Sequence, residues 1–414
     1  MNPLISLRPH QLRALNIMQR EDKGQIIVPT GGGKTYIMIN DFIAMLQECN
    51  EIEASNVTVV VAPRILLAQQ LCDDFYHQVP QDLNIFHAHS GRTTFPSSTK
   101  SDEIAEFVDN NHQTIIFTTY HSLKKVVESD ITIDCIYFDE SHNGTAKSFF
   151  DSVSAMSKYA TRCYYFTATP RISYKHDRGM NNKHIWGNIL ESVPAPELID
   201  GGSLIPPTII PFEVDTNYTK HNAHVHHSIT IQNVIDSIEL EGSKVLISVP
   251  SSKVLINMLS RTYLIKELRN KGYDLLHITS KFGAYVNNKK VNRSQFFETL
   301  KQWGEEKERK FVIFHYSILS EGINVSGLTH TVFLRNLNIV EMAQSIGRVI
   351  RMDKQDTKDI AEGTIDSGDI CNYRKSTGYC IIPTHKSYGT KTLKRMQRIT
   401  DDIFRDGVHT TAYC

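Results

Sequence analysis

The stretch Val28-Pro29-Thr30-Gly31-Gly32-Gly33-Lys34-Thr35 lies between an apolar run, Gln25–Val28, and an amphipathic stretch, Thr35–Gln47. Consecutive glycines let backbone N–H groups curl round an anion, and the amino end of a following helix adds a favourable dipole. Lys34 can reach the β- and γ-phosphates of a nucleotide, and the Thr35 hydroxyl can bind Mg²⁺. The stretch therefore predicts a phosphate-binding loop between a buried strand and a helix.

Short apolar runs of this kind recur along the chain and alternate with amphipathic stretches. The runs are mostly not strictly alternating, which is typical of strands buried on both faces of a parallel sheet. Strand and helix in alternation predict an α/β fold. The predicted strands are Gln25–Val28, Val57–Ala62, Thr114–Thr119, Cys135–Phe138, Tyr164–Thr167, Val245–Val249, Leu275–Ile278, Phe311–His315, Thr331–Leu334 and Gly378–Ile382, and the predicted helices include Thr35–Gln47, Ile65–Tyr76, Lys253–Asn270 and Ile339–Val349.

Composition narrows the class of protein. The 414 residues suffice for two or three domains, and 45 basic residues balance 45 acidic ones, so any basic surface is local. The seven cysteines form no Cys-x-x-Cys pair, which argues against a disulfide framework or a zinc site. No apolar stretch approaches the roughly 18 residues of a membrane span. Residues 1–4 show no basic stretch followed by an apolar run, so we do not expect secretion. We expect a cytoplasmic protein.

Two adjacent carboxylates follow the apolar run Cys135–Phe138. At the end of a strand, Asp139 can hold Mg²⁺ and Glu140 can orient and deprotonate an attacking water. Phosphoryl transfer depends mainly on positioning and charge neutralisation, so this pair is expected beside a phosphate loop. A solvated acidic turn is the less favoured interpretation.

Together these residues resemble the DEAH/DExH branch of the superfamily 2 helicases, with Asp139-Glu140-Ser141-His142 as the box. The resemblance covers roughly residues 7–352. Val28 stands where the strict phosphate loop has Gly, which is the form found in these helicases. The resemblance implies tandem RecA-like domains with parallel sheets and an ATP site in the cleft between them. It also implies ATP and Mg²⁺ as cofactors, with Thr35 and Asp139 as metal ligands.

The resemblance assigns roles to further residues. ATP binding falls to Arg8, Gln11, Thr30, Gly31, Gly32, Gly33, Lys34, Thr35 and Gly322; catalysis to Lys34, Asp139, Glu140, Gln344, Arg348 and Arg351; nucleic-acid contact to Pro63, Arg64, Thr118 and Thr119; and coupling of hydrolysis to movement to His142, Thr167 and Thr169. Asn324 stands where the family usually has Asp. Arg348 and Arg351 are three residues apart and share a helical face, from which arginines can stabilise charge on a γ-phosphate.

The predicted domains are residues 1–204, 205–385 and a basic helical tail, 386–414, with Gly201–Pro207 as the linker. Residues 353–377 are expected to form a surface loop.

The favoured function is a DNA helicase that unwinds or remodels branched DNA, similar to compact phage-type helicases and to the motor parts of restriction enzymes. An RNA helicase, and a nucleic-acid clamp or sensor with ATPase activity, remain open. Nucleic acid is the expected partner, with no membrane and no stable protein partner.

Overall fold

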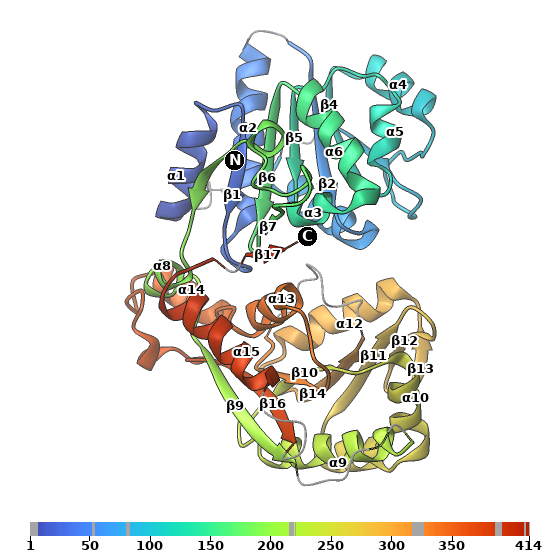
Figure 1. Ribbon diagram of the computed structural model, residues 1–414, viewed down its shortest axis with the longest axis vertical. Helices are drawn as coiled ribbons and strands as arrows, with labels where there is room; N and C mark the ends of the chain where they lie inside the picture. The colour runs from blue at the N-terminus through green and yellow to red at the C-terminus, as the bar shows by residue number, and fades with distance from the viewer. Residues whose placement is uncertain are drawn as a thin grey trace. The chain divides into compact units, whose positions relative to one another are not determined.

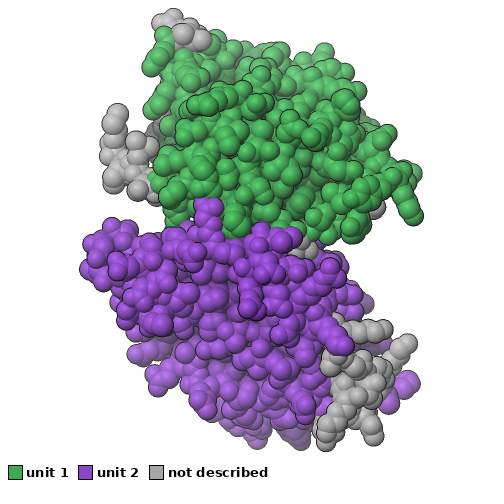
Figure 2. All heavy atoms as spheres, turned by 60° about the vertical axis from the view of Figure 1, so that its left-hand side comes forward, with its two compact units in different colours: residues 1–194, 409–414 green, residues 195–408 purple. Residues whose placement is uncertain are grey.

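The computed structural model describes residues 7–51, 54–79, 83–214, 219, 221–316, 327–385, 391–409 and 411–413. The chain divides into two compact units, residues 1–194 with 409–414, and residues 195–408 (Figures 1 and 2). The last residues therefore belong with the first unit, although the helices that precede them belong to the second.

Unit 1 is built round a sheet whose strand order among the described residues is β3-β4-β2-β5-β6-β1-β8, with every neighbouring pair parallel. Its strands are β1 (Lys23–Ile27), β2 (Asn56–Ala62), β3 (Asn84–Ala88), β4 (Gln113–Thr119), β5 (Cys135–Phe138), β6 (Arg162–Thr167) and β8 (Asn188–Ser192), with a separate parallel pair of β7 (Arg171–Ile172) and β17 (Ala412–Tyr413). Its helices are α1 (Pro9–Met18), α2 (Lys34–Glu51), α3 (Ile65–Tyr76), α4 (Ser101–Asp109), α5 (Leu123–Val127), the 3₁₀ turn η1 (Ser141–Thr145), α6 (Lys147–Tyr159) and α7 (Lys183–Trp186).

Helices cover both faces of this sheet. Val57, Val59 and Val61 of β2 point to one face, where they belong to a core cluster shared with α5 and α6. On the other face, Phe42 of α2 contacts Phe75 of α3, which contacts Phe117 of β4. Successive strand residues point to opposite faces, so a sheet that is buried on both sides needs the continuous apolar strands seen in the sequence.

Unit 2 has the strand order β13-β12-β11-β14-β10-β15-β16-β9. The pairs are parallel except at β12, which is antiparallel to β11 and β13. The strands are β9 (Pro207–Val214), β10 (Lys244–Ser248), β11 (Asp274–Thr279), β12 (Gly283–Val286), β13 (Lys289–Val291), β14 (Phe311–His315), β15 (His330–Phe333) and β16 (Gly378–His385). The helical elements are α8 (Ala195–Asp200), α9 (Ala223–Asp236), α10 (Ser252–Arg261), α11 (Leu264–Asn270), α12 (Arg293–Glu305), α13 (Ile339–Val349), α14 (Lys354–Ala361), η2 (Ile370–Asn372), α15 (Lys391–Thr400) and the π-helical turn η3 (Asp401–Arg405).

One face of the second sheet packs against α9, α10 and α11 in a single core cluster. On α12, Trp303 lies against Phe311 of β14, with the ring centroids 6.1 Å apart. The predicted fold class, two α/β domains with parallel sheets, is confirmed, with antiparallel pairing only at the β12 edge of the second sheet among the described strands.

Three local predictions are wrong. The expected single helix Lys253–Asn270 is two helices, because Thr262 turns its hydroxyl to the carbonyl of Met258 and accepts the N–H of Leu264. The expected linker Gly201–Pro207 is packed within unit 2, where Leu204 and Ile205 are fully buried. The expected surface loop, residues 353–377, contains α14.

Candidate nucleotide and nucleic-acid sites

The carboxyl ends of three neighbouring strands of unit 1 bring the predicted nucleotide residues together. The phosphate loop follows β1, Thr167 ends β6, and Asp139 and Glu140 follow β5. These strands are adjacent in the sheet, and the Val28 N–H donates to the carbonyl of Thr167 at 3.0 Å. In α/β sheets, ligands bind at the carboxyl ends of the strands.

The phosphate loop depends on its glycines. Gly31 and Gly33 have positive φ angles of 91° and 83°, a region that strains other residues. A Cβ on Gly33 would lie 2.3 Å from Nε2 of Gln11. Lys34 then opens α2. The turn therefore has the strand before it, the helix after it and the glycine geometry that an anion site requires.

Lys34 points toward the acidic pair. Its Nζ donates to the carbonyl of Val28 at 3.3 Å and lies 3.9 Å from Oε1 of Glu140. Burial, and then the neighbouring Glu140 carboxylate, raise the pKa of Asp139 to about 7, while Lys34 opposes this rise. Glu140 itself has φ +46°, a left-handed conformation that is uncommon for a residue with a side chain and often marks a functional site.

These residues fit a nucleotide with Mg²⁺. The half-buried carboxylate of Asp139 and the buried carboxylate of Glu140 are adjacent and leave the site short of positive charge, and Oε2 of Glu140 accepts no hydrogen bond from any described residue. Across the described ranges, no group of three or more His, Cys, Asp and Glu side chains could hold a metal alone. Asp139 and the Thr35 hydroxyl would therefore share the ion with phosphate oxygens, as Mg²⁺ sites commonly do.

The start of α1 contacts the phosphate loop. Gln11 accepts the N–H of Arg8 at 2.9 Å and donates to the carbonyl of Gly33 at 3.4 Å. Burial lowers the pKa of Arg8. His10 also reaches the loop, with Nε2 2.8 Å from the carbonyl of Gly32. The sequence did not single out His10 as a residue of this site, because its position beside Gln11 was the only indication of such a role.

A chain of contacts links the acidic pair to the end of β6. Nδ1 of His142 lies 3.4 Å from Oε2 of Glu140 and 3.0 Å from the hydroxyl of Thr167. That hydroxyl accepts the N–H of Thr169 at 3.1 Å. All four residues are buried. The predicted coupling residues thus lie in one connected group with Glu140.

The predicted nucleic-acid residues lie at two neighbouring strand ends. Ala62 of β2 pairs with Thr119 of β4, so Pro63 and Arg64, before α3, lie near Thr118 and Thr119. The Thr118 hydroxyl is buried and donates to the carbonyl of Ala88 at 2.8 Å, and that of Thr119 lies 3.4 Å from the Ser122 hydroxyl. The two threonines are therefore held internally, and their contact with nucleic acid stays a prediction.

Unit 2 carries the predicted arginine motif on and just after α13. Asn338 caps this helix, accepting the N–H of Glu341 at 2.9 Å. Gln344 and Arg348 are buried. Burial lowers the pKa of His315, at the end of β14, to about 3, and the positive charge of Arg348 contributes. Burial also lowers the pKa of Arg351, just beyond α13.

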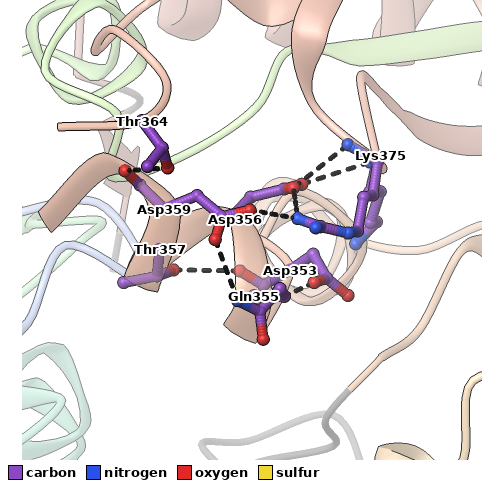
Figure 3. Close-up of polar contacts among 8 residues, drawn as sticks. Asp353, Gln355, Asp356, Thr357, Asp359, Thr364 and Lys375 are labelled. Atoms are coloured by element: carbon purple, nitrogen blue, oxygen red, sulfur yellow. Dashed lines mark hydrogen bonds and ion pairs between the residues drawn. The ribbon is translucent and has the colours of Figure 1, made fainter. Parts of the chain in front are cut away.

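The segment after α13 is held by a cluster in which the carboxylate of Asp356 binds Arg374 and Lys375 (Figure 3). Asp356 of α14 is fully buried and accepts the backbone N–H and the guanidinium of Arg374, at 3.1 and 3.0 Å. It also accepts the N–H of Lys375 at 3.3 Å, and Nζ of Lys375 donates to the carbonyl of Arg351 at 2.9 Å. The cluster therefore ties α14 to the backbone of the arginine motif.

Some predicted residues lie outside the described ranges. Gly322 and the motif around it, residues 320–325, are among them, as is Lys386, the first residue of the predicted basic tail. No helix among the described residues has the length and apolar character that crossing a membrane requires.

Two family models match the chain. The model described as "Type III restriction enzyme, res subunit" matches residues 4–172, and "Helicase conserved C-terminal domain" matches residues 229–353. The first match holds the phosphate loop and the acidic pair, and the second holds the arginine motif up to Arg351. The chain belongs to the superfamily 2 helicases. It carries both domains of an ATP-dependent helicase.

Solved structures agree with this helicase fold. An ATP-dependent Type ISP restriction-modification enzyme, LlaBIII, bound to DNA has a TM-score of 0.71 at 15% identity, covering 99% of this chain and 31% of that one. A putative HsdR subunit of a type I restriction enzyme from Vibrio vulnificus has a TM-score of 0.62 at 14% identity, covering 100% and 70%. The DEAD-box helicase Mss116, bound to ssRNA and UDP-BeF, has a TM-score of 0.61 at 16% identity, covering 99% and 75%.

The helicase thus spans about a third of the restriction-modification enzyme that it resembles. None of the curated proteins matches it in sequence.

Proposed function

We propose that this helicase is an ATP-driven motor that moves along DNA and unwinds or remodels branched DNA. The observation that carries the proposal is the connected group at the strand ends of unit 1. It joins the phosphate loop, Asp139 and Glu140 to Thr167 through His142. Such a group can transmit the state of a nucleotide to the backbone that follows β6.

The chemistry proposed for unit 1 is hydrolysis of the γ-phosphate bond. Lys34 neutralises phosphate charge, and Glu140 orients the attacking water and accepts its proton. A bound Mg²⁺ supplies further positive charge beside Asp139 and Thr35. Gln11 is the residue proposed to recognise the adenine, and its side chain lies beside the loop at Gly33.

The remaining positive charge in this proposal comes from the arginine motif. Arg348 and Arg351 act on the γ-phosphate, where an arginine stabilises the charge of the transition state. Substituting Arg348 by Lys retains the charge but loses the planar fork, so we expect most of the ATPase activity to be lost. If that variant keeps the wild-type rate, Arg348 does not serve this role.

DNA is favoured over RNA as the substrate. The similar Type ISP restriction-modification enzyme was solved bound to DNA, whereas the DEAD-box neighbour was solved bound to ssRNA. The first family match is also to a restriction-enzyme subunit. Contacts through phosphate carry no sequence information, so we expect little sequence preference and strong sensitivity to salt.

The proposal is tested by the ATPase rate against a panel of polymers: single-stranded DNA, duplex DNA, four-way junctions and single-stranded RNA. We expect stimulation by DNA, greatest with branched or single-stranded forms. Stimulation by RNA alone would overturn the DNA assignment. Junction migration without unwinding of simple forks would favour a remodeller over a processive helicase.

A further inference from the structure

Two exposed aromatic rings, one from each of the two chain segments that make up unit 1, lie together on its surface. Tyr174 is 81% exposed and Tyr413 is 73% exposed. Their ring centroids are 6.3 Å apart and the ring planes are inclined by 40°. Tyr413 is in β17 and Tyr174 follows β7, and these strands lie side by side (Figure 1).

The backbone holds both rings in place. β17 pairs with β7, and the Ala412 N–H donates to the carbonyl of Pro170 at 3.0 Å. The loop that carries Tyr174 is closed on itself, since Ser173 and Asn181 exchange two hydrogen bonds of 2.8 Å. A Cβ on Gly179 would lie 2.2 Å from the Ser173 nitrogen, so the closed loop leaves no room there. The backbone beside each ring is therefore held by hydrogen bonds.

The segment of sequence that carries Tyr174 is basic. Within residues 171–184, Asp177 is the only acidic residue, against Arg171, Lys175, Arg178 and Lys183. Lys175, next to Tyr174, is exposed. Aromatic rings with interleaved basic residues are the pattern by which proteins bind single-stranded nucleic acid, with bases stacked on the rings and phosphates near the cations.

We propose that Tyr174 and Tyr413 form a stacking surface for unpaired nucleobases, with Lys175 beside the phosphate backbone. The inference rests on the proposed function, which requires that the helicase hold nucleic acid. The strand β7, which leads to Tyr174, begins directly after Pro170, at the end of the segment that contains Thr167 and Thr169. Movement of that segment would therefore be passed to a base stacked on Tyr174.

The test compares two single strands of equal length, one with all its bases and one with abasic sites, at fixed salt. The variants are Tyr174→Ala and Tyr413→Ala, with Tyr174→Phe keeping the ring. Tyr159→Ala is the matched control, because Tyr159 is 74% exposed in the same unit but at the end of α6. Loss of one stacked base is expected to weaken binding roughly 5- to 100-fold.

We expect this loss for Tyr174→Ala and Tyr413→Ala, and on the complete strand only. The affinity for the abasic strand is expected to be the same for the wild type and for every variant. On the complete strand, Tyr174→Phe and Tyr159→Ala should bind with the affinity of the wild type. ATP hydrolysis measured without nucleic acid should be equal throughout, because neither Tyr174 nor Tyr413 belongs to the nucleotide site.

Equal losses on both strands, or no loss on either, would contradict the stacking surface while leaving the proposed function intact. An unchanged affinity would instead fit a surface that contacts protein. A wild-type protein that binds neither strand would contradict the proposed function and this inference together.

Discussion

Gly33 is the residue at which the geometry of the phosphate loop is most restrictive. The substitution Gly33→Ala adds a methyl group in a positive-φ conformation and places it against the side chain of Gln11. We expect ATP affinity to fall roughly tenfold or more, which corresponds to at least about 1.4 kcal/mol. The strain of the backbone itself costs about 1–2 kcal/mol of stability. Binding of a fluorescent ATP analogue, together with urea unfolding, measures both effects.

Gly363→Ala is the matched control for strain alone. Gly363 has φ +72°, but a Cβ added there meets no atom within 4 Å. It should lose similar stability and keep its ATP affinity. If both variants bind ATP as tightly as the wild type, the contact between Gly33 and Gln11 has no part in nucleotide binding.

At the scale of single residues, the sequence predicted those site residues that directly follow or end an apolar strand. The loop, the acidic pair and Thr167 could be located because each ends a recognisable apolar strand. The contact of His10 with Gly32 could not be predicted, because it depends on how α1 packs beside the loop. The internal use of the Thr118 hydroxyl likewise depends on the pairing of β3 with β4, which no local pattern reveals.

Among the elements, α14 shows how a buried charge can hold a helix that its sequence does not predict. Lys354–Ala361 is rich in charged residues and has few apolar ones, so residues 353–377 read as a loop. Its anchor is Asp356, whose partners Arg374 and Lys375 lie far along the chain. Sequence periodicity cannot report a contact of this kind.

The substitution Asp356→Ala tests this anchor. It removes an acceptor from Arg374 and Lys375, and hydrogen bonds to charged groups contribute about 1.5–3 kcal/mol each. We expect the free energy of unfolding to fall by about 2–3 kcal/mol in urea, since the exposed Arg374 side chain can be hydrated instead. Glu305→Ala is the control, because its ion pair with Lys354 is exposed and contributes less than about 1 kcal/mol. Equal effects of the two substitutions would show that the cluster is no anchor.

At the scale of the whole molecule, buried histidines make stability depend on pH. In unit 2, burial lowers the pKa values of His277, His315 and His330 to about 4, 3 and 4, with Arg348 and Lys375 adding to the shift at the last two. Their folded pKa values lie below the unfolded value of about 6.5, so the unfolded chain binds more protons between these limits. Stability is therefore full above about pH 6.5 and falls as the pH drops toward about 4.

Each of these histidines is expected to change the free energy of unfolding by up to about 1.4 kcal/mol per pH unit. Urea unfolding at pH 7.5, 6 and 5 measures it, and His277→Gln should reduce the slope by about one such contribution. His277 is suited to this test because its ring stacks on Tyr285, at 4.5 Å between centroids, and because it is not one of the residues assigned to the nucleotide. Identical pH dependence in the variant and the wild type would exclude the proposed contribution of His277.

The chain-level organisation was predictable only in outline. Two α/β units follow from the alternation of strands and helices. The burial of Leu204 and Ile205, and the return of β17 to unit 1, depend on long-range pairing. A Gly- and Pro-rich stretch such as Gly201–Pro207 reads as a linker unless its apolar residues are known to find partners.

The central claim, that the chain is an ATP-driven motor on nucleic acid, is tested most directly by displacement of a triplex-forming strand from DNA. We predict displacement by the wild type with ATP, none with a non-hydrolysable ATP analogue, and none by Lys34→Ala. Nucleic-acid-stimulated ATP hydrolysis by the wild type without any displacement would contradict the claim and indicate a clamp or sensor. So would displacement by Lys34→Ala at the wild-type rate.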